Sequence, residues 1–425
     1  MITVSAPSIA SGLRRTLLQA IAGRLRRSAA VAIAFIGCLC ATSVVATPDT
    51  RASVDPLAPN QVSVEQRLEL LVTALQAGRF GQSRRVAADL VAAHPDFRLG
   101  QLLYAEMLAA SIGDASRMSG AEAWSPALIE LMLEARVRIQ RRPPVPATDK
   151  LPDLFINAGR HLAHVVAVDL AASRMYLFDN TDQGLVLRRE HYVSSGLGGP
   201  GKRYEGDLKT PIGVYRIARF RSDARLPELY GSGALTLNYP NTMDRLFRRR
   251  GSGIWLHGVP RSSYNRSPYS SEGCVVMSND LLLDLHEHLN TDSTLVVLAE
   301  HLDWRSREQL GQKRLQHEQR LGRWLERQQA PVVASGGTRQ VAGKSGPSIP
   351  LSVFERLQSR DITFMHYPVQ PDPVPGAGEE FIMMQFTLPS VGSGETPAKR
   401  VTIYWRENAA GEWEFVRESI ETMAV

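Results

Sequence analysis

The sequence predicts a multidomain α+β protein: one or more N-terminal helical hairpins, a central β-rich sandwich with one helix, and a small C-terminal β-rich α+β domain. Three observations support this fold class. The chain has 425 residues, which is more than one ordinary domain holds. Apolar residues recur at helical spacing over residues 61–142, whereas short apolar segments typical of strands dominate from residue 151 onward. A content of 44% hydrophobic and 22% charged residues is that of a folded chain.

Residues 1–46 are expected to act as a signal peptide or a membrane anchor. Five arginines precede residues 28–46, which are uncharged and mostly apolar, and Val44-Val45-Ala46 offers a small residue for cleavage. Residues 28–46 are also long enough to cross a bilayer without cleavage. Both outcomes predict an exported, periplasmic or cell-envelope protein that meets the membrane only through this segment.

After a short linker, residues 61–142 are expected to form a helical module. Val64, Leu68, Leu71 and Leu75 are spaced three or four residues apart, as on one face of a helix. Residues 74–97 resemble a tetratricopeptide helix pair. Because a solenoid needs about three repeats and one is clear here, we interpret the module as a packing unit or a surface for a protein partner.

Residues 151–300 follow a proline-rich boundary at residues 143–146 and are expected to be β-rich. The one helix expected here begins after Ser278, whose hydroxyl can accept a hydrogen bond from the first turn. Its apolar side chains are Leu281, Leu282, Leu285 and Leu289. The expected strands cover residues 164–169, 174–178, 186–194, 210–217, 253–256, 274–277 and 294–298.

Three further segments complete the chain. A charged helix is expected over residues 301–328, a Gly/Ser/Pro linker over 331–350, and a β-rich accessory domain over 351–425. Strands are expected at 381–388, 400–406 and 412–417, with Gly411 in the turn between the last two. These strands resemble the end of a nuclear-transport-factor-2-like cone domain.

Charge and histidine spacing restrict the partners. A formal charge of +6 and a pI near 9.3 favour polyanionic neighbours such as a membrane surface or a wall polymer. Nucleic acid is not expected, because the basic residues form no stripe interleaved with aromatic side chains. A metal site is not expected either, because His286 and His288 point to different faces of one predicted helix.

Cys274 is the residue most indicative of chemistry. It is the only cysteine outside residues 1–46, and it lies seventeen residues after His257. A nucleophilic thiol needs a base within reach and backbone N–H groups that hold the developing oxyanion. Gly273 leaves the backbone open for such donors. Cys274 and His257 are expected near the ends of neighbouring strands. The pattern therefore indicates cysteine acyl transfer, the alternative being a buried, inert cysteine.

Residues 162–299 resemble the YkuD-type L,D-transpeptidase catalytic domain in three stretches. The first is an expected hairpin over residues 165–178. The second, residues 194–215, contains Gly206-Asp207-Leu208-Lys209-Thr210-Pro211-Ile212-Gly213, which is similar to the Gly-Asp-x-x-Thr-Pro-x-Gly pattern of that family. The third joins His257-Gly258 to Ser271-Glu272-Gly273-Cys274, where the family has His-Gly and Ser/Thr-His-Gly-Cys.

The resemblance implies a peptidoglycan L,D-transpeptidase that needs no cofactor. Cys274 would be the nucleophile that forms a thioester with a tetrapeptide stem, and His257 its general base. Gly273 and Ser271 would shape the oxyanion hole and the turn. Two alternatives remain open: a hydrolytic L,D-carboxypeptidase or amidase acting on wall peptides, and a non-catalytic wall-binding scaffold.

Four further residues are expected to bind substrate: Gly258, Tyr264, Arg266 and Glu272. Arg266 has the geometry to hold a stem-peptide carboxylate with two hydrogen bonds, the alternative being a solvated loop arginine. Glu272 replaces the histidine usual in the family, so it cannot act as a second imidazole. It is expected either to bind a substrate ammonium or to be a plain surface carboxylate.

Overall fold

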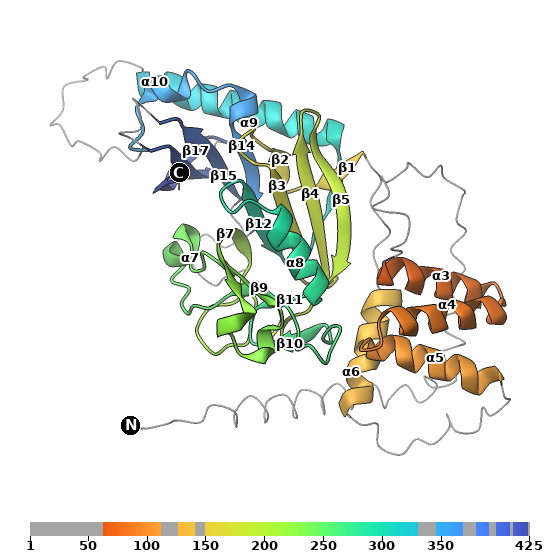
Figure 1. Ribbon diagram of the computed structural model, residues 1–425. Coiled ribbons are helices and arrows are strands. Elements are labelled where there is room, and N and C mark those ends of the chain that lie inside the picture. The colour runs from red at the N-terminus through yellow and green to blue at the C-terminus, as the bar shows by residue number, and fades with distance from the viewer. Residues whose placement is uncertain are drawn as a thin grey trace, which may run out of the picture.

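The computed structural model describes residues 63–111, 126–140, 149–329, 346–368, 380–390, 397–408 and 411–423. The expected leader, the proline-rich boundary at 143–146 and residues 331–345 of the expected linker lie outside these ranges. Within them, no helix combines the length and apolar character needed to span a bilayer. The predicted fold class is confirmed: N-terminal helices, a central curled β-sheet and a C-terminal β-rich region follow one another (Figure 1).

The N-terminal helices form one packed module beside the sheet (Figure 1). Ser63 opens its first helix with a capping box, in which the Ser63 hydroxyl accepts from Gln66 N and the Gln66 side chain accepts from Ser63 N. Leu71 and Leu90 are fully buried in the shared core. The elements are α3 (Val64–Gln76), α4 (Phe80–Ala93), α5 (Arg98–Ser111), α6 (Pro126–Ala135) and a π-helical turn, η2 (Arg136–Gln140).

In the described part of the chain the central sheet has eight strands. In spatial order they are β11 (Val275–Val276), β9 (Trp255–His257), β8 (Gly233–Leu237), β7 (Gly213–Ser222), β12 (Thr294–Ala299), β3 (His164–Asp169), β4 (Arg174–Thr181) and β5 (Gly184–Tyr192). β12 runs parallel to β3 and antiparallel to β7, so the sheet is mixed.

Smaller elements join these strands. Two short pairs accompany the sheet, β6 (Ser195–Gly196) with β10 (Tyr269–Ser271), and β1 (Lys150–Pro152) with β13 (Trp304–Ser306). The β7–β8 connection contains the 3-10 turns η3 (Asp223–Arg225) and η4 (Glu228–Tyr230), and α7 (Thr242–Leu246) follows β8.

A second sheet packs face to face on the central one. Its strands, in order, are β17 (Trp413–Thr422), β16 (Lys399–Glu407), β15 (Phe381–Leu388), β14 (Thr363–Tyr367) and β2 (Phe155–Asn157). β2 comes from the chain just before the central sheet, yet it pairs antiparallel with β14. The C-terminal region is therefore tied to the central one by backbone pairing as well as by side-chain packing.

The layers follow from the alternation of side chains along each strand. Val166 of β3 packs with Leu285 of α8 (Asn279–His288), which covers one face of the central sheet. The adjacent Val165 faces the other way and packs with Met365 of the second sheet. The order of layers is thus α8, central sheet, second sheet and a final helical layer.

The final layer is α9 (Arg307–Gln329) with the short helix α10 (Leu351–Phe354), which is followed by the 3-10 turn η5 (Ser359–Asp361). Trp324 of α9 packs edge-on against Phe354 and Trp405, with ring centroids 5.7 and 5.0 Å away. The charged helix expected from residue 301 begins at Arg307 instead, because residues 304–306 pair with β1 as strand β13.

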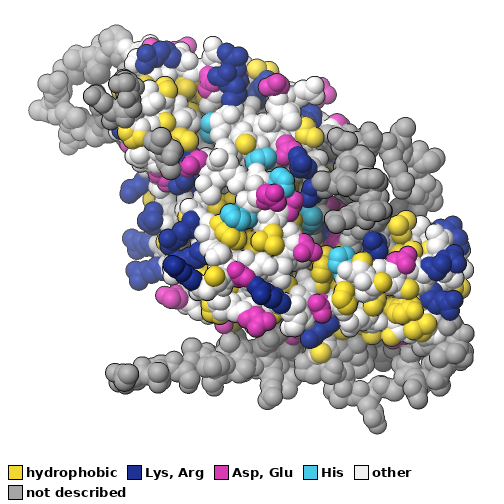
Figure 2. All heavy atoms as spheres, in the orientation of Figure 1, with side chains coloured by type: hydrophobic (Ala, Val, Ile, Leu, Met, Phe, Trp, Pro, Cys, Tyr) yellow, Lys and Arg dark blue, Asp and Glu magenta, His cyan; other side chains and the backbone are white. Residues whose placement is uncertain are grey.

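Figure 2 shows Lys and Arg side chains gathered along the edge of the molecule near α7. Arg245, Arg248 and Arg250, which lie in or just after α7, are all exposed. Arg249 between them is buried and pairs with Asp244. These three arginines make the surface around α7 basic.

We expect Asp244→Ala to lower the free energy of unfolding by about 3–5 kcal/mol, the usual cost of removing one partner of a buried ion pair. Asp244 and Arg249 are both buried, and the carboxylate oxygen Oδ1 lies 3.3 Å from Arg249 Nη1. Oδ2 accepts from Asn241 N at 3.0 Å. Urea unfolding measures the change. Arg245→Ala on the exposed side of α7 is the control, and a loss at Asp244 below about 1 kcal/mol contradicts the assignment.

Candidate active site

The structure places Cys274 and His257 on neighbouring strands at one edge of the central sheet. β11 begins directly after Cys274 and pairs in parallel with β9, which ends at His257. Val275 lies opposite Leu256, and Val276 lies opposite His257. This pairing is what brings together two residues separated by a seventeen-residue interval in the sequence.

A tight turn presents the thiol. The Ser271 hydroxyl accepts from Gly273 N at 3.1 Å and donates to the Cys274 carbonyl at 2.6 Å, so it bridges both sides of the turn. Gly273 has φ +130°, which L side chains rarely adopt, and a Cβ there would lie 2.7 Å from the Lys209 carbonyl oxygen. Ser271 and Gly273 therefore fix the backbone that carries Cys274.

The Cys274 thiol is held as a neutral S–H group. Cys274 is partly buried, and its Sγ donates to the Gly253 carbonyl at 3.3 Å. Burial raises the pKa of the thiol to about 11, and the charge of the exposed Glu272 acts in the same direction. The positive charges of Arg266 and Lys202 oppose this shift. At neutral pH the thiol therefore needs a base before it can react.

The His257 imidazole has a defined tautomer. Its Nδ1 lies 2.6 Å from the Gly258 carbonyl, which can only accept a hydrogen bond, so Nδ1 carries the proton and Nε2 keeps its lone pair. Burial lowers the pKa of the imidazole to about 4, and the charge of Arg266 contributes. The ring is thus neutral at pH 7 and able to accept a proton.

Gly258 and Tyr230 hold the imidazole in place. A Cβ on Gly258 would collide with Asn279 Oδ1, which accepts from Ser232 N at 2.9 Å. The Tyr230 ring packs edge-on against His257, with centroids 4.9 Å apart. The pKa of Tyr230 is raised by burial and by the charges that Cys274 and Glu272 carry when they are ionised, so the phenol lies near the thiol as well. Tyr230 could not be predicted from the sequence, because it belongs to no motif and lies in the three-residue turn η4.

Arg266 and Tyr264 occupy different places although only one residue separates them. The Arg266 guanidinium donates to the Leu229 carbonyl, and its charge lowers the pKa values of Cys274, His257 and Tyr230. The Tyr264 ring instead packs against His94 and Phe97 of the helical module, with centroids 4.7 and 5.3 Å away. Tyr264 therefore lies at the contact between the two modules.

The glycine-rich stretch before β7 is a folded turn. Lys202 and Asp207 form a buried ion pair at 2.8 Å. Asp207 also accepts from the backbone N–H groups of Arg203, Tyr204 and Lys209. Lys202 and Asp207 thus fix the shape of this turn, and the charge of Lys202 lowers the pKa of the Cys274 thiol.

The histidines outside the site have packing partners. His286 stacks on Phe220 with ring centroids 3.5 Å apart, and His288 Nδ1 contacts the Asp284 carbonyl at 2.8 Å. In the ranges that the structure describes, no three His, Cys, Asp or Glu residues gather as a metal site would require.

The central curled sheet carries a cysteine and a buried histidine on or beside two adjacent strands at its edge. Residues 163–298 match the YkuD family, the L,D-transpeptidase catalytic domain, and this part of the chain belongs to it. The identification of this domain from sequence motifs is therefore confirmed.

Three solved structures are similar to the chain. The helical cell shape determining protein Pgp2 from Campylobacter jejuni has 18% identity and a TM-score of 0.43, over 63% of this chain and 95% of that one. Bd1075 from Bdellovibrio bacteriovorus has 22% identity and a TM-score of 0.44, over 65% and 99%. An L,D-transpeptidase from Mycobacterium smegmatis has 14% identity and a TM-score of 0.22, over 32% and 58%. No curated protein sequence matches the chain significantly.

The state of the thiol predicts how alkylation depends on pH. With a pKa near 11, the thiolate fraction rises about tenfold per pH unit below that value. We expect the rate of Cys274 alkylation by iodoacetamide to climb continuously from pH 7 to 10. Mass spectrometry of the peptide that contains Cys274 measures it, with Cys274→Ser as the control. A plateau below pH 8 would indicate a stabilised thiolate and contradict the prediction.

Proposed function

We propose that this protein is an exported L,D-transpeptidase that transfers acyl groups between peptidoglycan stem peptides through Cys274. The observation that carries the proposal is the pairing of β11 with β9, which sets a neutral His257 beside the cysteine turn within a YkuD domain. Export is supported by the character of residues 1–46, and a protein partner of the helical module remains a prediction.

The first half of the reaction forms a thioester. Nε2 of His257 takes the thiol proton while Sγ of Cys274 attacks the carbonyl carbon of the third stem residue, a diamino acid. Because Gly273 N already donates to Ser271, we assign the Cys274 backbone N–H as the proposed oxyanion donor. The imidazolium then returns its proton to the amine of the terminal D-alanine, which leaves as the C–N bond breaks.

The second half consumes the thioester. An amine of a neighbouring stem attacks the acyl carbon and His257 accepts the amine proton. The C–S bond then breaks, and the imidazolium returns this proton to sulfur, which restores the thiol and the neutral imidazole. With water in place of the amine, the same steps give a carboxylic acid, which is the carboxypeptidase outcome. The choice between the two depends on which nucleophile the site admits.

Defined muropeptides incubated with the purified protein test the proposal by product mass. Transpeptidation gives a crosslinked dimer, and hydrolysis gives a stem shortened by one D-alanine or cut elsewhere, as by an amidase. Cys274→Ser protein is the matched control. Unchanged muropeptides, together with a wild-type thiol that no acylating probe labels, would favour a non-catalytic wall-binding scaffold instead.

A further inference from the structure

A polar cavity of about 330 Å³ lies between the helical module and the loop that joins His257 to Cys274. This volume is at the lower end of the range for small-molecule sites. One wall comes from the module and carries Asp96, Arg98, Glu130 and Glu134. Three of these four side chains are carboxylic acids, so this wall is mainly acidic.

The opposite wall comes from the catalytic domain and has a different character. It is lined by Arg266, Ser267 and Ser270. Hydroxyls both donate and accept hydrogen bonds, and a guanidinium pairs with carboxylates through a planar fork. The cavity therefore offers negative charge on one side and positive charge on the other.

Two neighbouring residues connect this cavity to the reaction centre. Arg266 lines the cavity, and its charge also acts on Cys274 and His257. Leu229 lines the cavity too, and its carbonyl accepts from Arg266 Nη2 at 3.4 Å. The next residue, Tyr230, packs on His257. A ligand in the cavity would thus lie beside the groups that surround the thiol.

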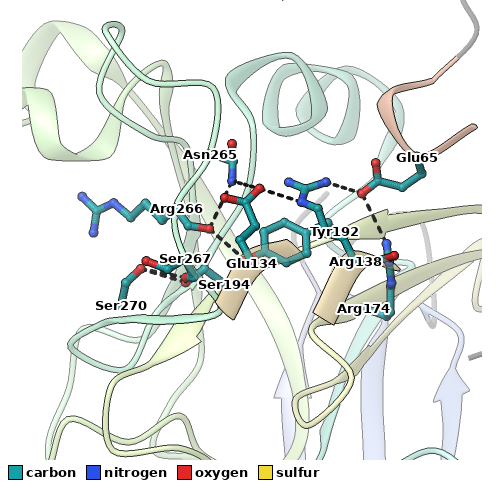
Figure 3. A network of polar contacts seen from close by, with 10 residues as sticks. All are labelled: Glu65, Glu134, Arg138, Arg174, Tyr192, Ser194, Asn265, Arg266, Ser267 and Ser270. Atoms are coloured by element: carbon teal, nitrogen blue, oxygen red, sulfur yellow. Dashed lines mark hydrogen bonds and ion pairs between the residues drawn. The ribbon is translucent and has the colours of Figure 1, made fainter. Parts of the chain in front are cut away.

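Glu134 of the acidic wall is held by the polar contacts that Figure 3 draws. Glu134 lies 2.7 Å from Arg138 Nε and accepts from Asn265 Nδ2 at 2.7 Å. Burial raises the pKa of Glu134 to about 6, against the opposing effect of Arg138, so the carboxylate is ionised at pH 7. Arg138 in turn pairs with Glu65 of α3. The helical module therefore reaches the loop through buried, charge-assisted contacts.

The same network fixes the loop that forms the second wall. The Tyr192 hydroxyl donates to the Arg266 carbonyl at 2.9 Å, and the Arg138 guanidinium lies over the Tyr192 ring, 3.7 Å from its centroid. The Ser194 hydroxyl donates to the Pro268 carbonyl at 3.1 Å. Both walls are therefore preorganised, which lowers the cost of binding a ligand between them.

We propose that this cavity is a substrate subsite that binds a zwitterionic amino-acid end, with an ammonium and a carboxylate on one carbon, at the tip of a wall-peptide side chain. The ammonium faces the acidic wall of α6, and the carboxylate faces Arg266 and the two serines. The proposal rests on the proposed function for its substrate class. It makes the helical module part of the substrate site.

Binding to full-length protein that carries Cys274→Ala tests the subsite without turnover. The probes are two tetrapeptides whose third residue is a diamino acid, its side chain ending in ammonium and carboxylate or in ammonium alone. We expect the zwitterionic peptide to bind at least ~10-fold more tightly by calorimetry. Adding Ala127→Phe, which fills the cavity from an exposed position on α6, should weaken its binding at least ~10-fold.

The matched control is Ala105→Phe, at an exposed position on α5 that does not line the cavity. It should leave the affinity within about twofold. If Ala127→Phe unfolds the module by circular dichroism, Glu130→Gln replaces it, and the preference for the zwitterionic peptide should then disappear. Equal affinity for both peptides, or binding that neither cavity variant changes, overturns the subsite.

Failure of the subsite and failure of the proposed function are separated by a second readout. Acylation of Cys274 by a small carbapenem-type probe does not need the cavity, so Ala127→Phe with the thiol intact should be labelled at the wild-type rate. Normal labelling with cavity-independent peptide binding rejects the subsite alone. A wild-type thiol that is never labelled rejects the enzymatic function, whatever the peptides do.

Discussion

Cys274→Ala is expected to abolish covalent labelling by a carbapenem-type acylating probe and to lower turnover of muropeptides on the order of 10³-fold or more. Wild-type protein should gain the mass of one probe per chain, located on the peptide that contains Cys274. The reason is that the thioester forms on this sulfur, and no neighbouring group replaces it: Ser271 is committed to the turn by its two hydrogen bonds.

The control for this change is Cys274→Ser, which keeps the shape of the turn and replaces the sulfur with a poorer nucleophile. Both variants should unfold at the wild-type temperature, because Cys274 is only partly buried and its Sγ donates to a loop carbonyl. Labelling that persists in Cys274→Ala would place the reactive group elsewhere and remove the basis of the proposed function.

His257→Ala is expected to slow acylation of Cys274 at pH 7 by at least ~10²-fold, the usual scale for loss of a general base. The pKa of the imidazole near 4 keeps it neutral throughout the neutral range, so the wild-type rate should show no histidine titration between pH 6 and 8. Single-turnover mass spectrometry of the acyl-enzyme gives both rates.

The pH dependence of this deficit distinguishes a base from a merely structural residue. As pH rises toward the thiol pKa of about 11, the thiolate forms without help, and the rate for His257→Ala should approach that of wild type. His257→Gln, which lacks a basic nitrogen, should behave like His257→Ala. A deficit of constant size from pH 7 to 10 would mean that His257 only supports the fold around Tyr230.

Local sequence patterns were sufficient to predict many of the helices and strands. The Ser278 cap and the leucines behind it predict α8, because a helix start and its buried stripe are both readable within one short segment. The strand expected at residues 381–388 appears as β15 with those same bounds. β8 was not anticipated, since all five of its residues are buried and it shows no alternation.

The residues of the candidate site were likewise predictable only in part from local sequence patterns. The cysteine and histidine are identifiable because each lies in a short glycine-containing motif. The sheet register that joins them is seen only in the pairing of β11 with β9. The place of Tyr230 beside His257 and the packing of Tyr264 on the helical module could not be predicted from the sequence. Both depend on contacts between separate elements. Their sequence neighbours carry no periodicity or motif that would single them out.

The pairing of β2 with β14 constrains the order in which this chain completes its structure. Asn157 of β2 donates to the carbonyl of Ser359, 202 residues further along. Closing so long a loop costs entropy before its contacts form, so hairpins of near neighbours such as β15–β16 assemble first. A ribosome must therefore synthesise most of the polypeptide before Phe155 and Ile156 can be buried. Until then these two side chains stay exposed, where chaperones can bind them or aggregation can begin.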